Sequence, residues 1–331
     1  MRKENPKIKK QRLQAAQDAI NDILLKEGYR IIKELKYGPR FLLAEVTKRN
    51  QRALLKVCLF TNTLDKRTNL KFSREILFLK FLARSKYRFL KKSVPKIYAS
   101  GLVPRTWYIR EYWPGKTQNV EGGDIRFKPS FFNKDNLDWV FKFFSALQSI
   151  KKKELPAELR KLLHRSYNFN RQLWRYLEPH FELIEGYLRQ PGVTQQFRRT
   201  IKEYIPAYNR ATQVLSHQEP YSAHFIKNDG GFTLIDWENI NWVNPVHDPV
   251  ALWMRAYDHP AWQHQLYLKF KRHYRNLRQF DELWIIETFT QSCFNIVSYY
   301  FHHDTEDLQG LAMFSEKKIK EILSHKPETL F

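Results

Sequence analysis

The chain has 331 residues and a mass of 40.0 kDa, which suits one two-lobed domain or two domains. Hydrophobic residues make up 43% and aromatic residues 15%, with only 11 glycines and 15 prolines, so global disorder and collagen-like or low-complexity structures are excluded. The net charge is +23, and residues 1–110 hold 28 Lys/Arg against 8 Asp/Glu, a net +20. This basic first third either serves solubility alone or predicts an anionic partner such as nucleic acid, acidic lipid or a phosphorylated ligand.

Cysteine content and hydropathy predict a soluble protein of a reducing compartment. Cys58 and Cys293 are the only cysteines, too few for a disulfide framework or a cysteine-based zinc site. The first fourteen residues contain no apolar segment of the secretory type, and no uncharged apolar run approaches the roughly 18 residues that a spanning helix needs. We therefore expect a cytoplasmic protein that is either free or peripheral at the membrane.

The N-terminal third is predicted to form a helix and then a small sheet. Residues 7–27 fit an amphipathic helix that ends at Gly28 and has one apolar face made by Leu13, Ala16, Ile20, Ile23 and Leu24. Short runs rich in β-branched and aromatic residues follow, separated by turn residues. They predict strands at 29–35, 41–47, 52–60, 94–100 and 107–112, with one helix at 73–82 between the third and fourth.

From about Asn133 onward the pattern is mostly helical, which predicts an α+β protein with two lobes. The expected helices are 134–150, 170–189, 195–213, 247–257, 261–275, 281–300 and 306–324. A hairpin of strands 223–227 and 232–236, joined by the turn NDGG, interrupts them. We expect a basic helical extension at 1–28, a β-rich lobe at 29–112 and a helical lobe at 113–331.

The hairpin region carries the residues best suited to chemistry. Glu219 lies two residues after His217, His224 follows Glu219 by five residues, and Asp236 ends the second predicted strand. Phosphoryl transfer needs a carboxylate that orients the attacking hydroxyl and further ligands for the metal that bridges the phosphates. A zinc site of His217, Glu219 and His224 is the weaker alternative, because the spacing is not that of His-Glu-x-x-His on one helix face.

Six motifs in order resemble the aminoglycoside phosphotransferase/choline kinase-like family, whose members have a two-lobed protein kinase-like fold. The resemblance covers about residues 30 to 258. It rests on RALLKV (52–57), SREILFLKFL (73–82), VPKIYASG (94–101), YIREYWPG (108–115), LIDWE (234–238) and NPVHDPVAL (244–252). It implies an ATP-dependent phosphotransferase that uses Mg²⁺ and moves the γ-phosphoryl group to a hydroxyl of a small molecule or glycolipid.

The resemblance also implies roles for single residues in the nucleotide site. Lys56 would hold the α- and β-phosphates and pair with Glu75. Backbone groups near Glu111 and Trp113 would bind adenine.

The resemblance implies further roles for residues of the catalytic and metal loops. Asp236 would hold the metal with help from His224, and Glu219 would orient the acceptor hydroxyl. His217 and Asp248 would brace the catalytic loop.

The catalytic loop departs from the family pattern at three positions. Glu219 stands where the family has aspartate, Gln218 where it has glycine, and His224 where it has asparagine. A shift of about 1 Å in a catalytic group can cost about a hundredfold in rate. An imidazole nitrogen suits transition metals better than Mg²⁺, so Mn²⁺ is an alternative metal. The departures leave open an active kinase, a weakened one or a regulatory pseudokinase whose partner is another protein.

The stretch 66–96 holds eleven Lys/Arg and one acid, Glu75, interleaved with apolar residues. We expect the apolar face of Ile76–Leu82 to pack on the sheet of the N-terminal lobe. The excess charge predicts contact with an anionic membrane or nucleic acid, and a kinase-like binding module that uses this surface is the alternative to an enzyme. The near-neutral helical lobe disfavours a polycationic aminoglycoside as acceptor; choline-like alcohols, sugars and glycolipid sugars match it better.

Overall fold

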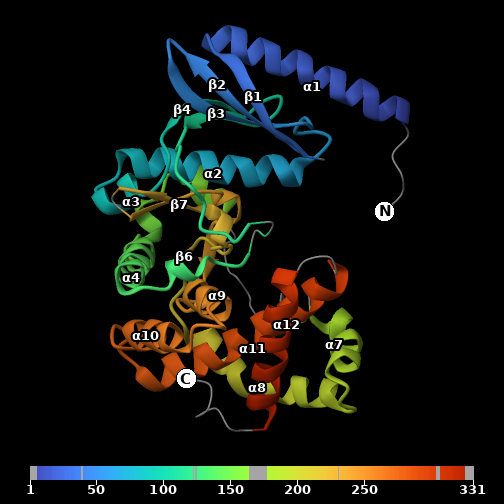
Figure 1. Cartoon of the computed structure of the whole chain (residues 1–331), viewed down its shortest axis with the longest axis vertical. Coiled ribbons are helices and arrows are strands. Elements are labelled where there is room, and N and C mark those ends of the chain that lie inside the picture. The colour runs from blue at the N-terminus through green and yellow to red at the C-terminus, as the bar shows by residue number, and fades with distance from the viewer. Residues whose placement is uncertain are drawn as a thin grey trace. The chain divides into compact units, whose positions relative to one another are not determined.

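An antiparallel sheet of five strands lies at the centre of the N-terminal part of the chain (Figure 1). The computed structural model describes residues 6–38, 40–121, 123, 125–163, 177–229, 231–302 and 306–324. These fall into two compact units. The N-terminal unit comprises the chain up to Gly115 together with 155–163 and 233–240, and the C-terminal unit comprises the rest.

The sheet has the order β1-β2-β3-β5-β4, which confirms the predicted antiparallel sheet. Its strands are β1 (Arg30–Tyr37), β2 (Phe41–Lys48), β3 (Gln51–Cys58), β4 (Ile97–Gly101) and β5 (Trp107–Glu111). Successive side chains of a strand point to opposite faces, so the two faces of β3 carry different residues. Ala53, Leu55 and Val57 are buried on one face. Lys56 therefore lies on the other, where its register partner is Tyr108 of β5.

Two helices cover the two faces of this sheet (Figure 1). Helix α1 (Pro6–Glu27) contributes Ile20, Ile23 and Leu24 to the core formed with β2, β3 and β5, and Gly28 ends it with a left-handed φ of 71°. Helix α2 (Lys66–Arg84) lies against the other face and begins seven residues earlier than predicted. The reason is Asp65, whose carboxylate accepts the Thr68 backbone N–H at 3.0 Å as an N-cap.

The C-terminal unit is mainly helical, as expected for this fold class. Its helices are α4 (Lys134–Gln148), α7 (Phe181–Leu188), α8 (Val193–Arg210), α9 (His247–Arg255), α10 (Pro260–Lys271), α11 (Leu277–Phe301) and α12 (Glu306–Leu323). Helix α11 packs against α7, α8, α9 and α12. The predicted hairpin is present as β7 (Phe225–Asn228) and β8 (Gly231–Leu234), and a second short pair joins β6 (Val214–Ser216) to β9 (Asn241–Val243).

Several short elements were not predicted, because they contain too few residues to show a period. They are α3 (Arg88–Lys92), α5 (Ala157–Leu162), the β6–β9 pair and the 3₁₀ turns 129–131, 152–154, 178–180, 222–224 and 237–239. Residues 170–176 of the helix predicted at 170–189 lie outside the described residues. Among the helices that the structure describes, none is both long and apolar enough to span a bilayer.

Candidate active site

A buried lysine is surrounded by three carboxylates in the N-terminal unit. The Nζ atom of Lys56 lies 3.3 Å from Glu75 Oε2, 3.1 Å from Asp236 Oδ1 and 3.3 Å from Glu238 Oε2. Lys56 is 7% exposed and Glu75 only 1%. The predicted Lys56–Glu75 pair is therefore present, and Asp236 joins it although 180 positions separate it from Lys56 in sequence.

The electrostatics of this cluster favour the charged lysine. Burial alone would lower the pKa of Lys56, but the charges of Asp236, Glu75 and Glu238 outweigh burial and raise it well above its usual value. Burial raises the pKa of Glu75, and the neighbouring Lys56 opposes this increase. The Lys56 ammonium group is thus held by carboxylates, and phosphate oxygens could replace one of these carboxylates as its partner.

The loop that carries Asp236 is fixed by the tryptophan that follows it. Trp237 is fully buried, its ring centroid lies 4.8 Å from that of Phe78 on α2, and its Nε1 donates to the Leu234 carbonyl at 2.9 Å. Its backbone N–H donates to Glu75 Oε1 at 3.3 Å. Asp236 itself has a left-handed φ of 66°, and its side chain is 30% exposed. The packing of Trp237 thus aims the Asp236 carboxylate at Lys56.

The same cluster has the donor atoms that a divalent cation requires. One carboxylate oxygen from each of Glu75, Asp236 and Glu238 lies within 4.8 Å of the other two. Carboxylate oxygen is the ligand that Mg²⁺ and Mn²⁺ prefer, so the residues fit a nucleotide-bound metal. Asp236 and Glu238 are the accessible members, whereas Glu75 is buried against Lys56.

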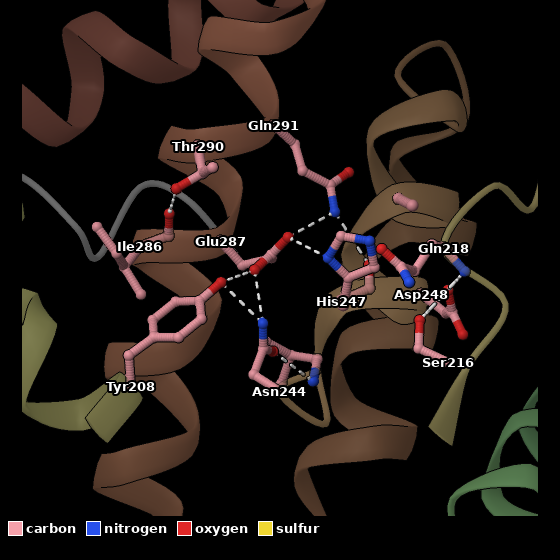
Figure 2. A network of polar contacts seen from close by, with 12 residues as sticks. Tyr208, Ser216, Gln218, Asn244, His247, Asp248, Ile286, Glu287, Thr290 and Gln291 are labelled. Atoms are coloured by element: carbon pink, nitrogen blue, oxygen red, sulfur yellow. Dashed lines mark hydrogen bonds and ion pairs between the residues drawn. The ribbon is translucent and has the colours of Figure 1, made fainter. Parts of the chain in front are cut away.

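The predicted catalytic loop lies in the C-terminal unit and is braced by Asp248. The Asp248 carboxylate accepts hydrogen bonds at 2.8 Å from the Ser216 hydroxyl and from the backbone N–H groups of His217 and Gln218. Burial raises the pKa of Asp248 to about 6, although these three hydrogen bonds oppose the increase. The structure thus gives Asp248 the bracing contacts that the sequence predicted (Figure 2). His217, the loop residue before Gln218, is fully buried.

The backbone conformation at Gln218 is one that favours glycine, the residue expected at this position of the loop from the family pattern. Gln218 has a φ of 72°, in the left-handed region. A side chain with a Cβ pays about 1–2 kcal/mol for that conformation and glycine does not. The glutamine therefore needs contacts that hold it there.

Glu219 and His224 are linked through the loop backbone. The Nδ1 atom of His224 lies 2.7 Å from the Glu219 carbonyl oxygen, which is only an acceptor. Nδ1 must then carry the proton in neutral His224, and the lone pair is on Nε2. Metal-binding histidines commonly have this arrangement. His224 and Asp236 lie in different units, and their predicted shared metal stays a prediction.

Three charged residues of these groups were not among the predicted site residues. Glu238 lies two positions after Asp236, within a motif that was recognised. Lys71 Nζ lies 3.5 Å from Glu238 Oε1, and its place one turn before Glu75 on α2 is a signal that could have identified it. Arg255 is buried with its guanidinium 4.5 Å from the centre of the Tyr221 ring. Burial lowers the Arg255 pKa, and the neighbouring Tyr221 and Glu219 oppose this decrease.

The segment predicted to bind adenine ends β5. The Glu111 backbone N–H donates to the Lys96 carbonyl at 2.8 Å, and its carboxylate accepts the Lys96 N–H at 3.2 Å. The Glu111 N–H is therefore engaged within the sheet. Trp113 is half-buried, and its indole N–H is buried without a hydrogen-bond partner among the described residues. Adenine binding at this segment remains a prediction.

The basic stretch 66–96 places most of its charge in solvent. Ile76, Leu79 and Leu82 are buried, as expected. Nine of its eleven basic residues are exposed: Lys66, Arg67, Lys80, Arg84, Lys86, Arg88, Lys91, Lys92 and Lys96. Binding of a membrane or nucleic acid to this surface remains a prediction.

Comparison with known families decides the assignment. The model of the phosphotransferase enzyme family matches residues 40–283. The chain belongs to this family. The match covers both the Lys56 cluster and the catalytic loop, which confirms the resemblance inferred from the motifs.

Several phosphotransferases of known structure have the same fold as this chain, although their sequence identity to it is low. The aminoglycoside phosphotransferase APH(4)-Ia matches with a TM-score of 0.57 and 11% identity over 93% of this chain and 98% of that one. The choline kinase LicA from Streptococcus pneumoniae matches with a TM-score of 0.55 and 16% identity over 93% and 98%. A macrolide 2′-phosphotransferase from Brachybacterium faecium has a TM-score of 0.51 and 14% identity over 90% and 97%. These likenesses establish the two-lobed kinase-like fold. Among proteins with curated descriptions, no sequence matches this one.

Proposed function

We propose that this phosphotransferase moves the γ-phosphoryl group of ATP to a hydroxyl of a small molecule or glycolipid. The observation that carries the proposal is Lys56, buried and held by Glu75, with Asp236 and Glu238 as accessible carboxylates beside it. Binding of a nucleoside triphosphate requires a cation that contacts the phosphates and oxygen ligands for the metal that bridges them. Family membership supports the same activity.

Each residue of the N-terminal group has one task in this proposal. Lys56 binds the α- and β-phosphates, and Glu75 of α2 holds the Lys56 ammonium group through their ion pair. Asp236 and Glu238 would hold Mg²⁺ or Mn²⁺ through their carboxylate oxygens. When bound, the metal neutralises charge on the phosphate oxygens.

The C-terminal group acts on the acceptor. Glu219 accepts the proton of the acceptor hydroxyl as its oxygen forms a bond to the γ-phosphorus and the bond from that phosphorus to the bridging oxygen of ADP breaks. The products are the phosphorylated acceptor and ADP. Asp248 and His217 hold the loop that carries Glu219, and His224 orients the same loop through the Glu219 carbonyl.

The acceptor is proposed to be uncharged or singly charged. Residues 111–331, which include the whole C-terminal unit, hold 29 Lys/Arg and 26 Asp/Glu, a net charge of +3. Polycations such as aminoglycosides bind where carboxylates are in excess. Sugars, choline-like alcohols and glycolipid sugars are therefore the first acceptors to test.

Glu219→Gln is expected to lower kcat by about a hundred- to ten-thousandfold, the usual contribution of a catalytic base, with KM for ATP unchanged. Glu219→Asp, which introduces the family's residue, should keep activity within about tenfold of wild type. Formation of ADP and transfer of labelled phosphate to an acceptor panel measure both. Glu203→Gln, an exposed carboxylate on α8, is the matched control.

The alternative outcome identifies a pseudokinase. Metal-dependent ATP binding without ADP formation for any acceptor, in wild type and in Glu219→Asp alike, would contradict the enzymatic proposal. Wild-type turnover in Glu219→Gln would contradict only the role given to Glu219.

A further inference from the structure

Two loops of the N-terminal unit present aliphatic side chains to solvent. Leu64, in the loop between β3 and α2, is 73% exposed, and Leu102 and Val103, in the loop between β4 and β5, are 38% and 78% exposed. Leucine and valine are usually buried in folded proteins, because burial removes their apolar surface from water. Single exposed aliphatic residues are common, but these three together form an apolar loop patch.

The two loops leave the same end of the five-stranded sheet. Trp107, the first residue of β5, has two register partners. One is Val57, next to the last residue of β3, and the other is Gly101, the last residue of β4. The loop that follows β3 and the loop that joins β4 to β5 therefore start side by side.

Hydrogen bonds hold the two loops together. The backbone N–H of Asn62 donates to the Pro104 carbonyl at 2.8 Å, and its Nδ2 donates to the Leu102 carbonyl at 2.7 Å. The Leu64 backbone N–H donates to the Thr61 carbonyl at 3.0 Å, which closes a turn in the first loop. The exposed side chains of the apolar loop patch are thus carried by a fixed backbone.

Exposed cations lie beside both loops. Lys66 and Arg67 are exposed in the first turn of α2, immediately after the first loop. Lys80 is also exposed, and its Nζ donates at 2.7 Å to the hydroxyl of Ser100, at the end of β4 beside the second loop. The only acid in either loop is Asp65, which is engaged as the N-cap of α2. The surface around the patch therefore has a net positive charge.

We propose that this end of the N-terminal unit docks on an anionic lipid bilayer. The aliphatic side chains of the apolar loop patch enter the boundary between headgroups and acyl chains, and Lys66, Arg67 and Lys80 contact the lipid phosphates. Because the proposal concerns binding alone, it does not depend on phosphotransferase activity.

The size and chemistry of the surface favour a bilayer over a macromolecular partner. Three aliphatic side chains are too few for the roughly 800 Å² that each partner buries in a stable protein interface. Nucleic acid offers phosphates to the cations, but its backbone offers no apolar medium to aliphatic loops. A bilayer surface offers both, and shallow insertion together with electrostatic attraction needs only a few side chains of each kind.

Co-sedimentation of the full chain with vesicles tests the proposal. Wild type should bind mixed phosphatidylglycerol/phosphatidylcholine vesicles about tenfold more tightly than vesicles of phosphatidylcholine alone. The double variant Leu64→Ser, Val103→Ser keeps every charge and should bind the mixed vesicles about tenfold more weakly. Leu25→Ser, at a residue 85% exposed on α1, is the matched control and should bind as wild type does.

Both substituted side chains of the double variant are exposed, so its Tm should stay that of wild type. Equal binding of wild type and the double variant to the mixed vesicles would overturn the proposal. Absence of wild-type binding to the mixed vesicles would overturn it as well.

A fluorescent label distinguishes insertion from attraction by charge alone. Cys58 and Cys293 are both buried, so Val103→Cys adds one accessible thiol for an environment-sensitive dye. Mixed vesicles should shift the emission of this dye to shorter wavelength and leave the same dye on Leu25→Cys unchanged. An equal response at the two positions, or a DNA oligonucleotide that binds the chain more tightly than the vesicles do, would overturn the bilayer as the partner.

Discussion

Asp236→Asn is expected to lower phosphoryl transfer by on the order of a thousandfold while the protein stays folded. The substitution keeps the shape of the side chain and removes the negative charge 3.1 Å from Lys56 Nζ. That charge serves both the metal and the orientation of Lys56, and removal of one preorganised charge at a reacting phosphate costs several kcal/mol of transition-state stabilisation. ADP formation at saturating ATP measures the effect.

Asp229→Asn is the matched control for this experiment. Asp229 is an exposed aspartate after β7, seven residues before Asp236. It should retain wild-type turnover. Activity of Asp236→Asn within tenfold of wild type would contradict the metal-binding role of Asp236.

Lys56→Met is expected to abolish ATP binding and to lower the free energy of unfolding by about 3–5 kcal/mol. The methionine fills a similar volume, but it leaves Glu75 buried without the cation that compensates its charge. Urea unfolding and equilibrium ATP binding measure the two effects. Lys80→Met, an exposed lysine on the same helix as Glu75, should change neither.

A double substitution separates the two effects of Lys56→Met. Glu75→Gln in the Lys56→Met background removes the uncompensated charge, so we expect it to restore part of the stability and none of the ATP binding. Recovery of ATP binding in the double variant would show that Lys56 serves only the fold. Additive stability losses would show that the two side chains do not interact.

The order of the elements could be predicted from sequence because most of them show a clear period. The strand pattern of 41–47 and 52–60 and the helical patterns of 134–150 and 281–300 agree with β2, β3, α4 and α11 within a few residues. The predicted start of α2 is seven residues too late, because the apolar period of the helix does not reveal that Asp65 caps its N-terminus. The packing of α1 on the sheet through Ile20, Ile23 and Leu24 required the structure, since an amphipathic face does not show what covers it.

The candidate site could be predicted where motifs carry it and not where only tertiary packing does. Lys56, Glu75 and Asp236 follow from strand, helix and hairpin motifs, and the structure brings these three together. Arg255 lies on α9, whose other buried residues are mostly apolar. Nothing in the local sequence distinguishes it from an exposed helix arginine. The left-handed conformation of Gln218 was also invisible, because glutamine gives no signal of it.

Metal-dependent nucleotide binding tests the central claim most directly. A ligand that binds only the folded chain at a hundred times its Kd stabilises it by about 2.7 kcal/mol, which is several degrees in Tm for a protein of this size. We predict that ATP with Mg²⁺ or Mn²⁺ raises the Tm of the wild-type protein by several degrees, that ATP without metal raises it much less, and that Asp236→Asn removes the metal-dependent part. An unchanged Tm under every condition, or an equal shift in wild type and Asp236→Asn, would contradict a nucleotide site at Lys56, Asp236 and Glu238.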